Sequence, residues 1–247
     1  MRAPTLVLLH GALNDHTVWA PIVPGLAARG WQVLAPDLPG HGATPGPALA
    51  SVEDMADWVL ARLDGAGIAS ALLAGHSMGS LVALEAAHRA PRRVAGLALL
   101  GSTWPMAVSD ALLRTARDDE AAAIEMVAQW SHADGSSAEA DATRALMRRL
   151  AQAAPGAGLL HTDLQACNTY ANGAAAAAAA VHCPVLFVQG SQDRMTPPRK
   201  AKTLTDALPH GRIVTVDAGH ALMAEQSDAI LAALAAFARE VAGADAR

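Results

Sequence analysis

The chain has 247 residues, of which 52% are hydrophobic and 17% charged, so it can bury a large core and is too apolar to be disordered. Its 18 Lys and Arg against 23 Asp and Glu give a formal charge of -5 without a basic block, which argues against nucleic acid as a partner. Charges, prolines and glycines interrupt every apolar run before the roughly 18 residues that span a bilayer, and the two cysteines, Cys167 and Cys183, suit a reducing compartment. We therefore expect a soluble, cytoplasmic protein without a membrane partner.

Short apolar runs alternate with amphipathic stretches, which is the pattern of a mostly parallel sheet covered by helices on both faces. Helices are expected after a cap at Ser51, from directly after Ser77 to about Ala90, and at the C-terminal end after a cap at Ser227. The sequence therefore predicts an α/β fold with about six strands. The predicted strands are residues 5–9, 32–35, 71–74, 95–100, 185–188 and 212–216.

The strand pattern stops over residues 104–180, where the sequence becomes alanine-rich, charged and helical. This divides the chain into a first part of the α/β core (1–103), a helical insertion (104–180) and a second part of the core (181–247). The seven alanines at 174–180 are predicted to form a helix, since alanine is the strongest helix former. We expect the insertion to be a lid, and the alternative is a helical subdomain that only adds core.

The segment Gly75-His76-Ser77-Met78-Gly79 matches the pattern Gly-x-Ser-x-Gly and lies between a predicted strand and a predicted helix. A serine on such a tight turn is presented at the helix N-terminus, where the dipole and free amides favour the negative charge of acyl transfer. Ser77 is therefore the candidate nucleophile, and an ordinary glycine-rich turn is the alternative. The side chain of His76 is expected to point away from the nucleophile.

A serine hydroxyl needs a base to take its proton, and the base needs an acid that fixes its tautomer. Asp193 and His220 follow the last two predicted strands, so both are expected at the carboxyl edge of the sheet, where Ser77 also lies. Asp217 is the alternative acid, although its place on the same strand end as His220 makes their hydrogen bond harder to form. The sequence therefore predicts a triad in the order Ser77, Asp193, His220.

The oxyanion of a tetrahedral intermediate needs two hydrogen-bond donors. The amide of Met78, directly after the nucleophile, is predicted to be one donor, and the amide of Ala12, in the glycine loop after the first strand, the other. The amide of Leu13 is the alternative to that of Ala12, and a turn without a catalytic role is the alternative for the whole loop. Residues of the substrate pocket are sought among side chains that could equally pack in the core. These candidates are Leu13, Trp104, Met106, Trp130 and His132.

The chain resembles the α/β-hydrolase superfamily over nearly its whole length, on segments that occur in the family's order. These are LLHGALNDHTVW, DLPGHG, AGHSMGSLVALEAA, VQGSQDRMTPP and DAGHALMAEQ. The resemblance implies the α/β-hydrolase fold, with Ser77 as nucleophile, Asp193 as acid, His220 as base, and Ala12 and Met78 as oxyanion donors. Within the superfamily the chain is similar to small carboxylesterases, enol-lactonases and pimeloyl-carrier-protein methyl esterases. The loop at 37–42 is expected to be mainly structural.

We therefore expect a serine hydrolase that cleaves a small carboxylic ester through an acyl-enzyme on Ser77, without a metal or a cofactor. Lactone hydrolysis, haloperoxidase-type perhydrolysis and carbon-carbon bond hydrolysis are alternatives within enzymes. His76 stands where the carbon-carbon bond hydrolases usually have Asn, which weakens the last of these. A non-enzymatic alternative is a small-molecule sensor that uses the same fold. Repeated turnover of an activated ester distinguishes an enzyme from a sensor.

Overall fold

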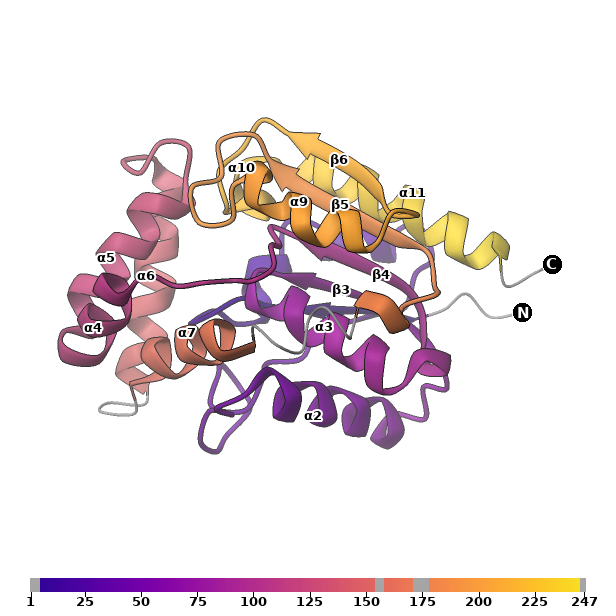
Figure 1. The fold of residues 1–247 in the computed structure, drawn as a ribbon, viewed down its shortest axis with the longest axis horizontal. Helices are drawn as coiled ribbons and strands as arrows, with labels where there is room; N and C mark the ends of the chain where they lie inside the picture. The colour runs from indigo at the N-terminus through magenta and orange to yellow at the C-terminus, as the bar shows by residue number, and fades with distance from the viewer. Residues whose placement is uncertain (1–4, 154–157, 171–177, 245–247) are drawn as a thin grey trace.

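The computed structural model describes residues 5–153, 158–170 and 178–244, and its centre is a six-stranded sheet in which all neighbouring strands are parallel. The strand order is β2-β1-β3-β4-β5-β6 (Figure 1). This architecture confirms the predicted α/β fold of about six strands. The strands are β1 (Thr5–Leu9), β2 (Val33–Leu34), β3 (Ala71–His76), β4 (Val94–Leu100), β5 (Val185–Gly190) and β6 (Arg212–Val216).

Helices connect the strands and fill the long interval between β4 and β5. The helices that accompany the sheet are η1 (His16–Trp19), α1 (Val23–Ala27), α2 (Val52–Gly65), α3 (Met78–Arg89), η2 (Pro91–Arg93), α9 (Pro198–Ala207), α10 (Leu222–Glu225) and α11 (Ser227–Ala244). The helices between β4 and β5 are α4 (Asp110–Asp118), α5 (Glu120–Ser131), α6 (Ala138–Ala153) and α7 (Leu159–Thr169). Ser51 caps α2 as predicted, because its hydroxyl accepts a hydrogen bond from the amide of Asp54 at 3.1 Å.

Two element boundaries differ from the sequence prediction in ways that matter for the site. Strand β3 extends to His76, because its ladder with β4 continues to a pair between His76 and Leu100. Ser227 is the first residue of α11 rather than its cap, since the carbonyl of the preceding Gln226 already accepts the amide of Ile230 at 3.0 Å. Most of the helix predicted at 174–180 lies outside the described residues.

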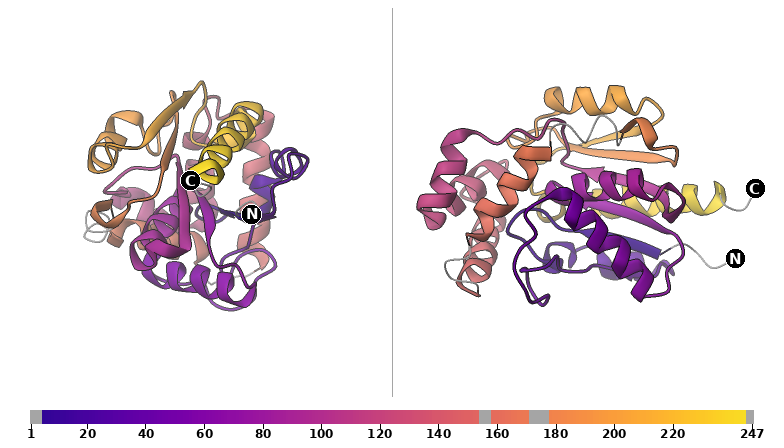
Figure 2. Two further views of the ribbon diagram at one scale, coloured as in Figure 1. Left: turned by 90° about the vertical axis from the view of Figure 1, so that its right-hand side faces the viewer. Right: turned by 60° about the horizontal axis from the view of Figure 1, so that its bottom comes forward.

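The side chains of the strands alternate between two hydrophobic cores, one on each face of the sheet. Leu73 and Phe187 point to the face covered by α2, α3 and α9. Leu72 and Leu186 point to the opposite face, which is covered by η1, α1 and α11 (Figure 2). Because both faces are covered, every residue of β3 and β5 is buried, which explains why these strands are continuous apolar runs in the sequence.

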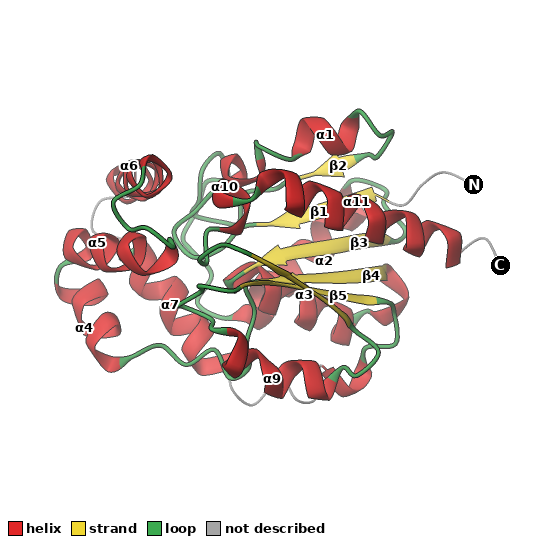
Figure 3. Cartoon of the chain, turned by 90° about the horizontal axis from the view of Figure 1, so that it is seen from above, coloured by secondary structure: helices red, strands yellow, loops and turns green. Residues whose placement is uncertain are grey.

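Helices α4 to α7, the part of the helical insertion that the structure describes as helices, lie beyond the carboxyl ends of the strands (Figures 1 and 3). Strand β1 begins, and helix α11 ends, at the opposite end of the molecule. The insertion has a hydrophobic core of its own, which includes Leu112, Ile124, Met147 and Leu160. Leu13, from the loop after β1, belongs to the same core and thereby joins the insertion to the sheet.

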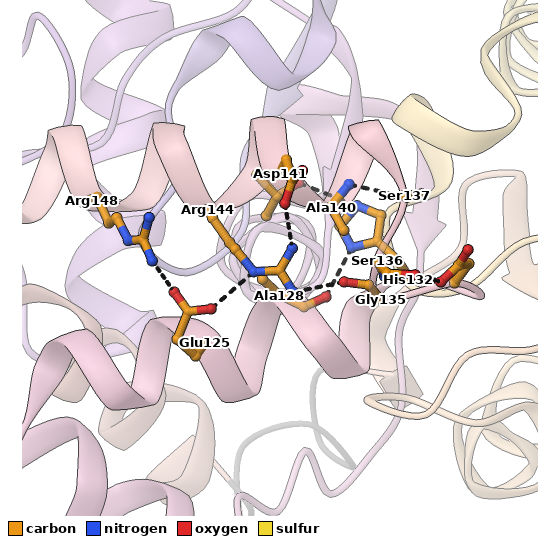
Figure 4. A network of polar contacts seen from close by, with 12 residues as sticks. Glu125, Ala128, His132, Gly135, Ser136, Ser137, Ala140, Asp141, Arg144 and Arg148 are labelled. Atoms are coloured by element: carbon orange, nitrogen blue, oxygen red, sulfur yellow. Dashed lines mark hydrogen bonds and ion pairs between the residues drawn. The ribbon is translucent and has the colours of Figure 1, made fainter.

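A network of ion pairs connects α5 with α6 (Figure 4). Arg144 of α6 lies 3.0 Å from Glu125 of α5 and 2.9 Å from Asp141, and Arg148 pairs with Glu125 as well. Arg144 also donates a hydrogen bond to the carbonyl oxygen of Gly135 at 2.6 Å. Since exposed ion pairs contribute only about 0–1 kcal/mol each, the shared hydrophobic core supplies most of the stability and the network fixes how the two helices align.

Both cysteines are free thiols, as the sequence predicts, with Cys167 buried in α7 and Cys183 half-buried. Burial raises the pKa of the Cys167 thiol, which makes it a poor nucleophile. Within residues 5–153, 158–170 and 178–244, no helix is long and apolar enough to cross a membrane.

Candidate active site

The residues predicted to act together follow four different strands and meet at the carboxyl edge of the sheet. Ala12 follows β1, Ser77 follows β3, Asp193 follows β5 and His220 follows β6. The chain passes from β1 to β2 on one side and returns to β3 on the other side of β1, so the topology of the sheet switches direction between β1 and β3. In open α/β sheets, ligands bind in the crevice at such a switch point.

Ser77 occupies the turn between β3 and α3 in a strained backbone conformation, with φ at 52° and ψ at -120°. Its amide donates a hydrogen bond to the carbonyl oxygen of Leu100 at 2.9 Å, which attaches the turn to the end of β4. A non-glycine residue at positive φ persists only where the surrounding structure holds it, and such residues gather at functional sites. The turn therefore has the backbone geometry of a nucleophile elbow.

The glycines of the elbow are required because backbone passes where their side chains would be. A Cβ atom at Gly75 would overlap the backbone of Gly79, and one at Gly79 would overlap the carbonyl groups of Leu9 and His10. The turn can therefore pack against β1 only with glycine at these two positions.

Replacing Gly79 by alanine is expected to lower the free energy of unfolding by about 3 kcal/mol, since backbone atoms cannot move aside as a flexible side chain can. Urea denaturation followed by circular dichroism measures this. Gly65→Ala is the matched control: a Cβ there meets nothing within 4 Å, and the change is expected to stay within about 1 kcal/mol of wild type. Equal stability of the two variants would contradict the account of the elbow.

Asp193 and His220 form a buried hydrogen-bonded pair, with 2.8 Å between Oδ2 of Asp193 and Nδ1 of His220. The hydroxyl of Thr196 donates to the same Oδ2 at 2.7 Å, and the amides of Met195 and Thr196 donate to Oδ1 at 2.8 and 2.7 Å. Burial opposes ionisation of Asp193, but the facing His220 ring and these donors outweigh it and lower its pKa to about 2. Asp193 is thus a carboxylate that fixes the orientation of the imidazole.

The alternative acid, Asp217, lies on the surface. Its Oδ1 accepts hydrogen bonds from the hydroxyl of Ser191 at 3.0 Å and from the amide side chain of Gln192 at 2.9 Å. These contacts lower the pKa of Asp217 without involving His220.

The end of β4 brings Ser77 and His220 into one site. The carbonyl oxygen of Leu100 accepts the hydrogen bond from the amide of Ser77. The next residue, Gly101, lies against the ring of His220, because a Cβ at this position would be 3.0 Å from Cε1 of His220. Ser77, His220 and Thr196 all line the same cavity, which has a volume of about 620 Å³. The structure therefore brings together the predicted nucleophile, base and acid.

His76 is a site residue whose position differs from the sequence expectation. Its ring lies against that of His220, with 4.7 Å between the centroids, and its Nε2–H donates to the carbonyl oxygen of His220 at 2.8 Å. Burial lowers the pKa of His76 to about 3, so the ring is neutral. It also lines the cavity beside Ser77. His76 therefore supports the backbone of His220 without placing a second positive charge next to it.

The two amides predicted as oxyanion donors lie at the cavity and at the elbow. Met78 is the first residue of α3, where amides have no partner within the helix, and Ala12 lines the cavity. The amide of Leu13, the alternative to Ala12, already donates to Oδ2 of Asp163 at 2.8 Å. This bond occupies the amide of Leu13 and favours Ala12 over Leu13 as the donor from that loop.

The predicted pocket residues divide between the cavity and the core. Trp130 and Met106 line the cavity, whereas Leu13, Trp104 and His132 are not among its lining residues. Leu13 is buried in the core of the insertion, and Trp104 packs against the core beside the sheet. Both nitrogens of the buried His132 ring are engaged within the insertion, with the carbonyl of Ala128 at 3.0 Å and the hydroxyl of Thr143 at 3.2 Å.

The chain matches the model of the family described as alpha/beta hydrolase fold over residues 4–226 and belongs to that family. It is therefore an enzyme of the hydrolase class. Two similar proteins are pimeloyl-[acyl-carrier protein] methyl ester esterases. The one from Aromatoleum aromaticum is 33% identical over 90% of this chain and 92% of its own. The one from Edwardsiella ictaluri is 35% identical over 94% of this chain and 92% of its own. These relatives confirm the resemblance to the methyl-esterase branch.

Solved structures show the same fold. The enol-lactonase from Burkholderia xenovorans superimposes with a TM-score of 0.81 at 23% identity, covering 96% of this chain and 92% of its own. An esterase from Exiguobacterium antarcticum reaches a TM-score of 0.84 at 17% identity, again covering 96% of this chain and 92% of its own. At these identities the likeness concerns the fold alone.

Proposed function

We propose that the protein is a serine esterase that cleaves small, uncharged carboxylic esters through an acyl-enzyme on Ser77. The observation that supports this most directly is the 2.8 Å hydrogen bond between Asp193 and His220 at a cavity that Ser77 shares. An acid, an imidazole and a serine in that relation form a general-base triad. The two esterase relatives support the same class of reaction.

In the proposed reaction the hydroxyl oxygen of Ser77 attacks the ester carbonyl carbon while Nε2 of His220 takes the hydroxyl proton. The amides of Ala12 and Met78 stabilise the oxyanion, which then collapses and expels the alcohol with the proton held by His220. Water next attacks the acyl-enzyme, His220 accepts its proton, and the carboxylic acid leaves as Ser77 regains its hydroxyl. Asp193 remains ionised throughout and stabilises the imidazolium.

The lining of the cavity supports an apolar acyl group. Its inner wall comes from the helical insertion and includes Leu112, Val127, Met147, Leu160 and Leu164, all buried. The two Lys and Arg side chains among the described lining residues, Arg194 and Lys200, are exposed. A substrate with a carboxylate at the far end of its acyl chain would therefore lose hydration without gaining a buried cation. The two relatives are named for a methyl ester, and small methyl esters fall within the proposed class.

We further propose that residues 104–180 act as the lid predicted from the sequence and select the substrate through this wall. In that role the insertion determines which acyl groups fit into the cavity, while residues in the loops at the ends of the strands catalyse the reaction. The volume of about 620 Å³ lies within the range of about 300–1,000 Å³ that is usual for small-molecule sites.

A panel of p-nitrophenyl esters tests the proposed substrate class. We expect repeated turnover, and we expect kcat/KM for p-nitrophenyl hexanoate to exceed that for the adipate monoester, which has the same chain length but ends in a carboxylate, by about tenfold or more. Equal rates on the matched pair would contradict the apolar acyl site. Release of one equivalent of p-nitrophenol per chain without further turnover would contradict the proposed esterase activity and favour a small-molecule sensor.

A further inference from the structure

Asp163, on α7 of the helical insertion, is a fully buried acidic residue that the proposed reaction does not use. Its Oδ2 accepts a hydrogen bond from the amide of Leu13 at 2.8 Å and lies 2.9 Å from Nε2 of His41. Its Oδ1 is buried and has no hydrogen-bond partner among the residues that the structure describes. Because an incompletely paired buried carboxyl group is costly, its retention at this position calls for an explanation.

The ring of His41 faces an oxygen acceptor at each nitrogen. Nδ1 lies 3.1 Å from the carbonyl oxygen of Pro39, and Nε2 faces Asp163. A ring between a carbonyl and a carboxylate satisfies both only when both nitrogens carry protons. Burial opposes this charge on His41, but the charge of Asp163 outweighs it and raises the pKa of His41. The pair is therefore a buried imidazolium and carboxylate that join the insertion to the loop at 37–42.

Hydrogen bonds from three sides fix both peptide groups that flank Ala12, and one of them is the bond to Asp163. In the peptide between Ala12 and Leu13, the N–H is held by Asp163 and the carbonyl accepts the side-chain amide of Asn14 at 2.9 Å. In the peptide between Gly11 and Ala12, the carbonyl accepts the Nδ1–H of His10 at 2.9 Å. Because a trans peptide points its N–H opposite to its carbonyl, these bonds determine the direction of the Ala12 amide.

Leu13 needs this support, because its φ of 45° is unfavourable for a residue with a branched side chain. Its side chain is buried in the core of the insertion, so the backbone conformation and the side-chain position are both set by contacts with helices outside the sheet. Without the bond to Asp163, the loop can relax to an ordinary negative φ, and the amide of Ala12 then changes direction.

We propose that Asp163 is a positioning residue that holds the oxyanion loop, through Leu13 and His41, in the conformation that stabilises the transition state. The inference rests on the proposed function, since it requires that the amide of Ala12 binds the oxyanion. It makes the insertion a part of the catalytic apparatus as well as a selector of substrates. The oxyanion hole is then complete only when α7 is packed against the rest of the molecule.

The variant Asp163→Asn tests this role, with Tyr170→Phe as the matched control. Tyr170 follows α7 and donates to Glu85 of α3 at 2.7 Å, so its replacement also removes a hydrogen bond between the insertion and the core but leaves the oxyanion loop untouched. On p-nitrophenyl butyrate we expect Asp163→Asn to lower kcat by about 10- to 100-fold with KM within about twofold of wild type. Tyr170→Phe is expected to keep kcat within about twofold.

The pH profile of kcat separates positioning from general stability. The titratable groups near the pair are His10, whose pKa burial and the neighbouring His41 lower to about 4, and Cys167, whose pKa burial raises. His41, whose pKa is raised above its ordinary value, is therefore the group expected to titrate as the pH rises. Because its folded pKa is raised, the pair is complete below the ordinary pKa of His41 and is lost as the pH rises through the raised value. Wild type should therefore lose kcat on the alkaline side, and Asp163→Asn should lack that decline.

Should Asp163→Asn not fold, His41→Gln carries the same test, because it removes the cation while leaving the carboxyl group and Leu13 in place. The same missing alkaline decline is expected, with a smaller fall in kcat because the bond between Asp163 and Leu13 remains. If wild type turns over esters through an acyl-enzyme on Ser77, a variant kcat like that of Tyr170→Phe would overturn the positioning role. An alkaline decline that persists in the variant would overturn it as well. Failure of wild type to turn over any ester would instead overturn the proposed function.

Discussion

Replacing Ser77 by alanine is expected to lower kcat on p-nitrophenyl butyrate by about 10⁴-fold or more, to the residual rate that an oxyanion hole and binding alone provide. In the proposed reaction the hydroxyl is the group that attacks the ester, and nothing else at the strained turn can replace it. KM should stay within about twofold, because the apolar wall of the cavity is untouched. Steady-state kinetics on purified protein measures both quantities.

Ser51→Ala is the matched control for this change. Ser51 is also a serine at the N-terminus of a helix, where it caps α2. Its loss should lower the free energy of unfolding by about 1 kcal/mol while turnover stays at the wild-type rate. A Ser77→Ala enzyme that keeps more than a tenth of the wild-type kcat would show that another group is the nucleophile.

Asp193→Asn should lower kcat by about 10⁴-fold while the fold persists. The side-chain amide would present N–H to Nδ1 of His220, so the ring would hold its proton on Nε2, the nitrogen that accepts the Ser77 proton in the proposed reaction. Kinetics of the purified variant, with its thermal unfolding as a check of the fold, measure this effect.

Asp217→Asn provides the control, since Asp217 is exposed and bonded to Ser191 and Gln192. We expect this variant to turn over like wild type. If Asp217→Asn were the inactive variant and Asp193→Asn retained wild-type turnover, the assignment of the acid would be reversed.

The pH dependence of stability follows from the hydrogen-bonded pair of Asp193 and His220. Because the pKa of Asp193 is lowered from 3.8 to about 2 in the folded protein, its contribution to stability is present above the ordinary value and is lost as the pH falls through the lowered one. Asp193→Asn should therefore show a smaller loss of stability between these two pH values than wild type does.

The fold could be predicted from the sequence because its central strands, β1, β3, β4 and β5, are buried on both faces. Strands β1 and β6 have the predicted bounds, and β5 begins where its apolar run begins. The extension of β3 to His76 could not be read from hydrophobicity, since the backbone ladder continues through a polar side chain. The lost cap at Ser227 depends on α10, a single turn that has no periodicity of its own.

The candidate triad was predictable because each of its members follows a strand, and parallel strands end at one edge. The amides of Met195 and Thr196 carried a signal that was missed, since an aspartate side chain in a loop commonly accepts hydrogen bonds from the backbone that follows it. The contact between His76 and His220 and the bond between Asp163 and Leu13 carried no signal. They join residues 144 and 150 positions apart, and only the assembled sheet in the first case, and the packing of the insertion on the sheet in the second, brings these groups together.

Intact-mass analysis after exposure to a fluorophosphonate tests the central claim most directly, because this reagent phosphonylates a serine, with loss of fluoride, only where a base and an oxyanion hole activate it. We predict one adduct per wild-type chain, located at Ser77 by peptide mapping, a much slower adduct in Asp193→Asn, and none in Ser77→Ala. Wild type that gains no adduct and hydrolyses no ester, or an adduct that forms equally on Ser77→Ala, would contradict the acyl-enzyme mechanism.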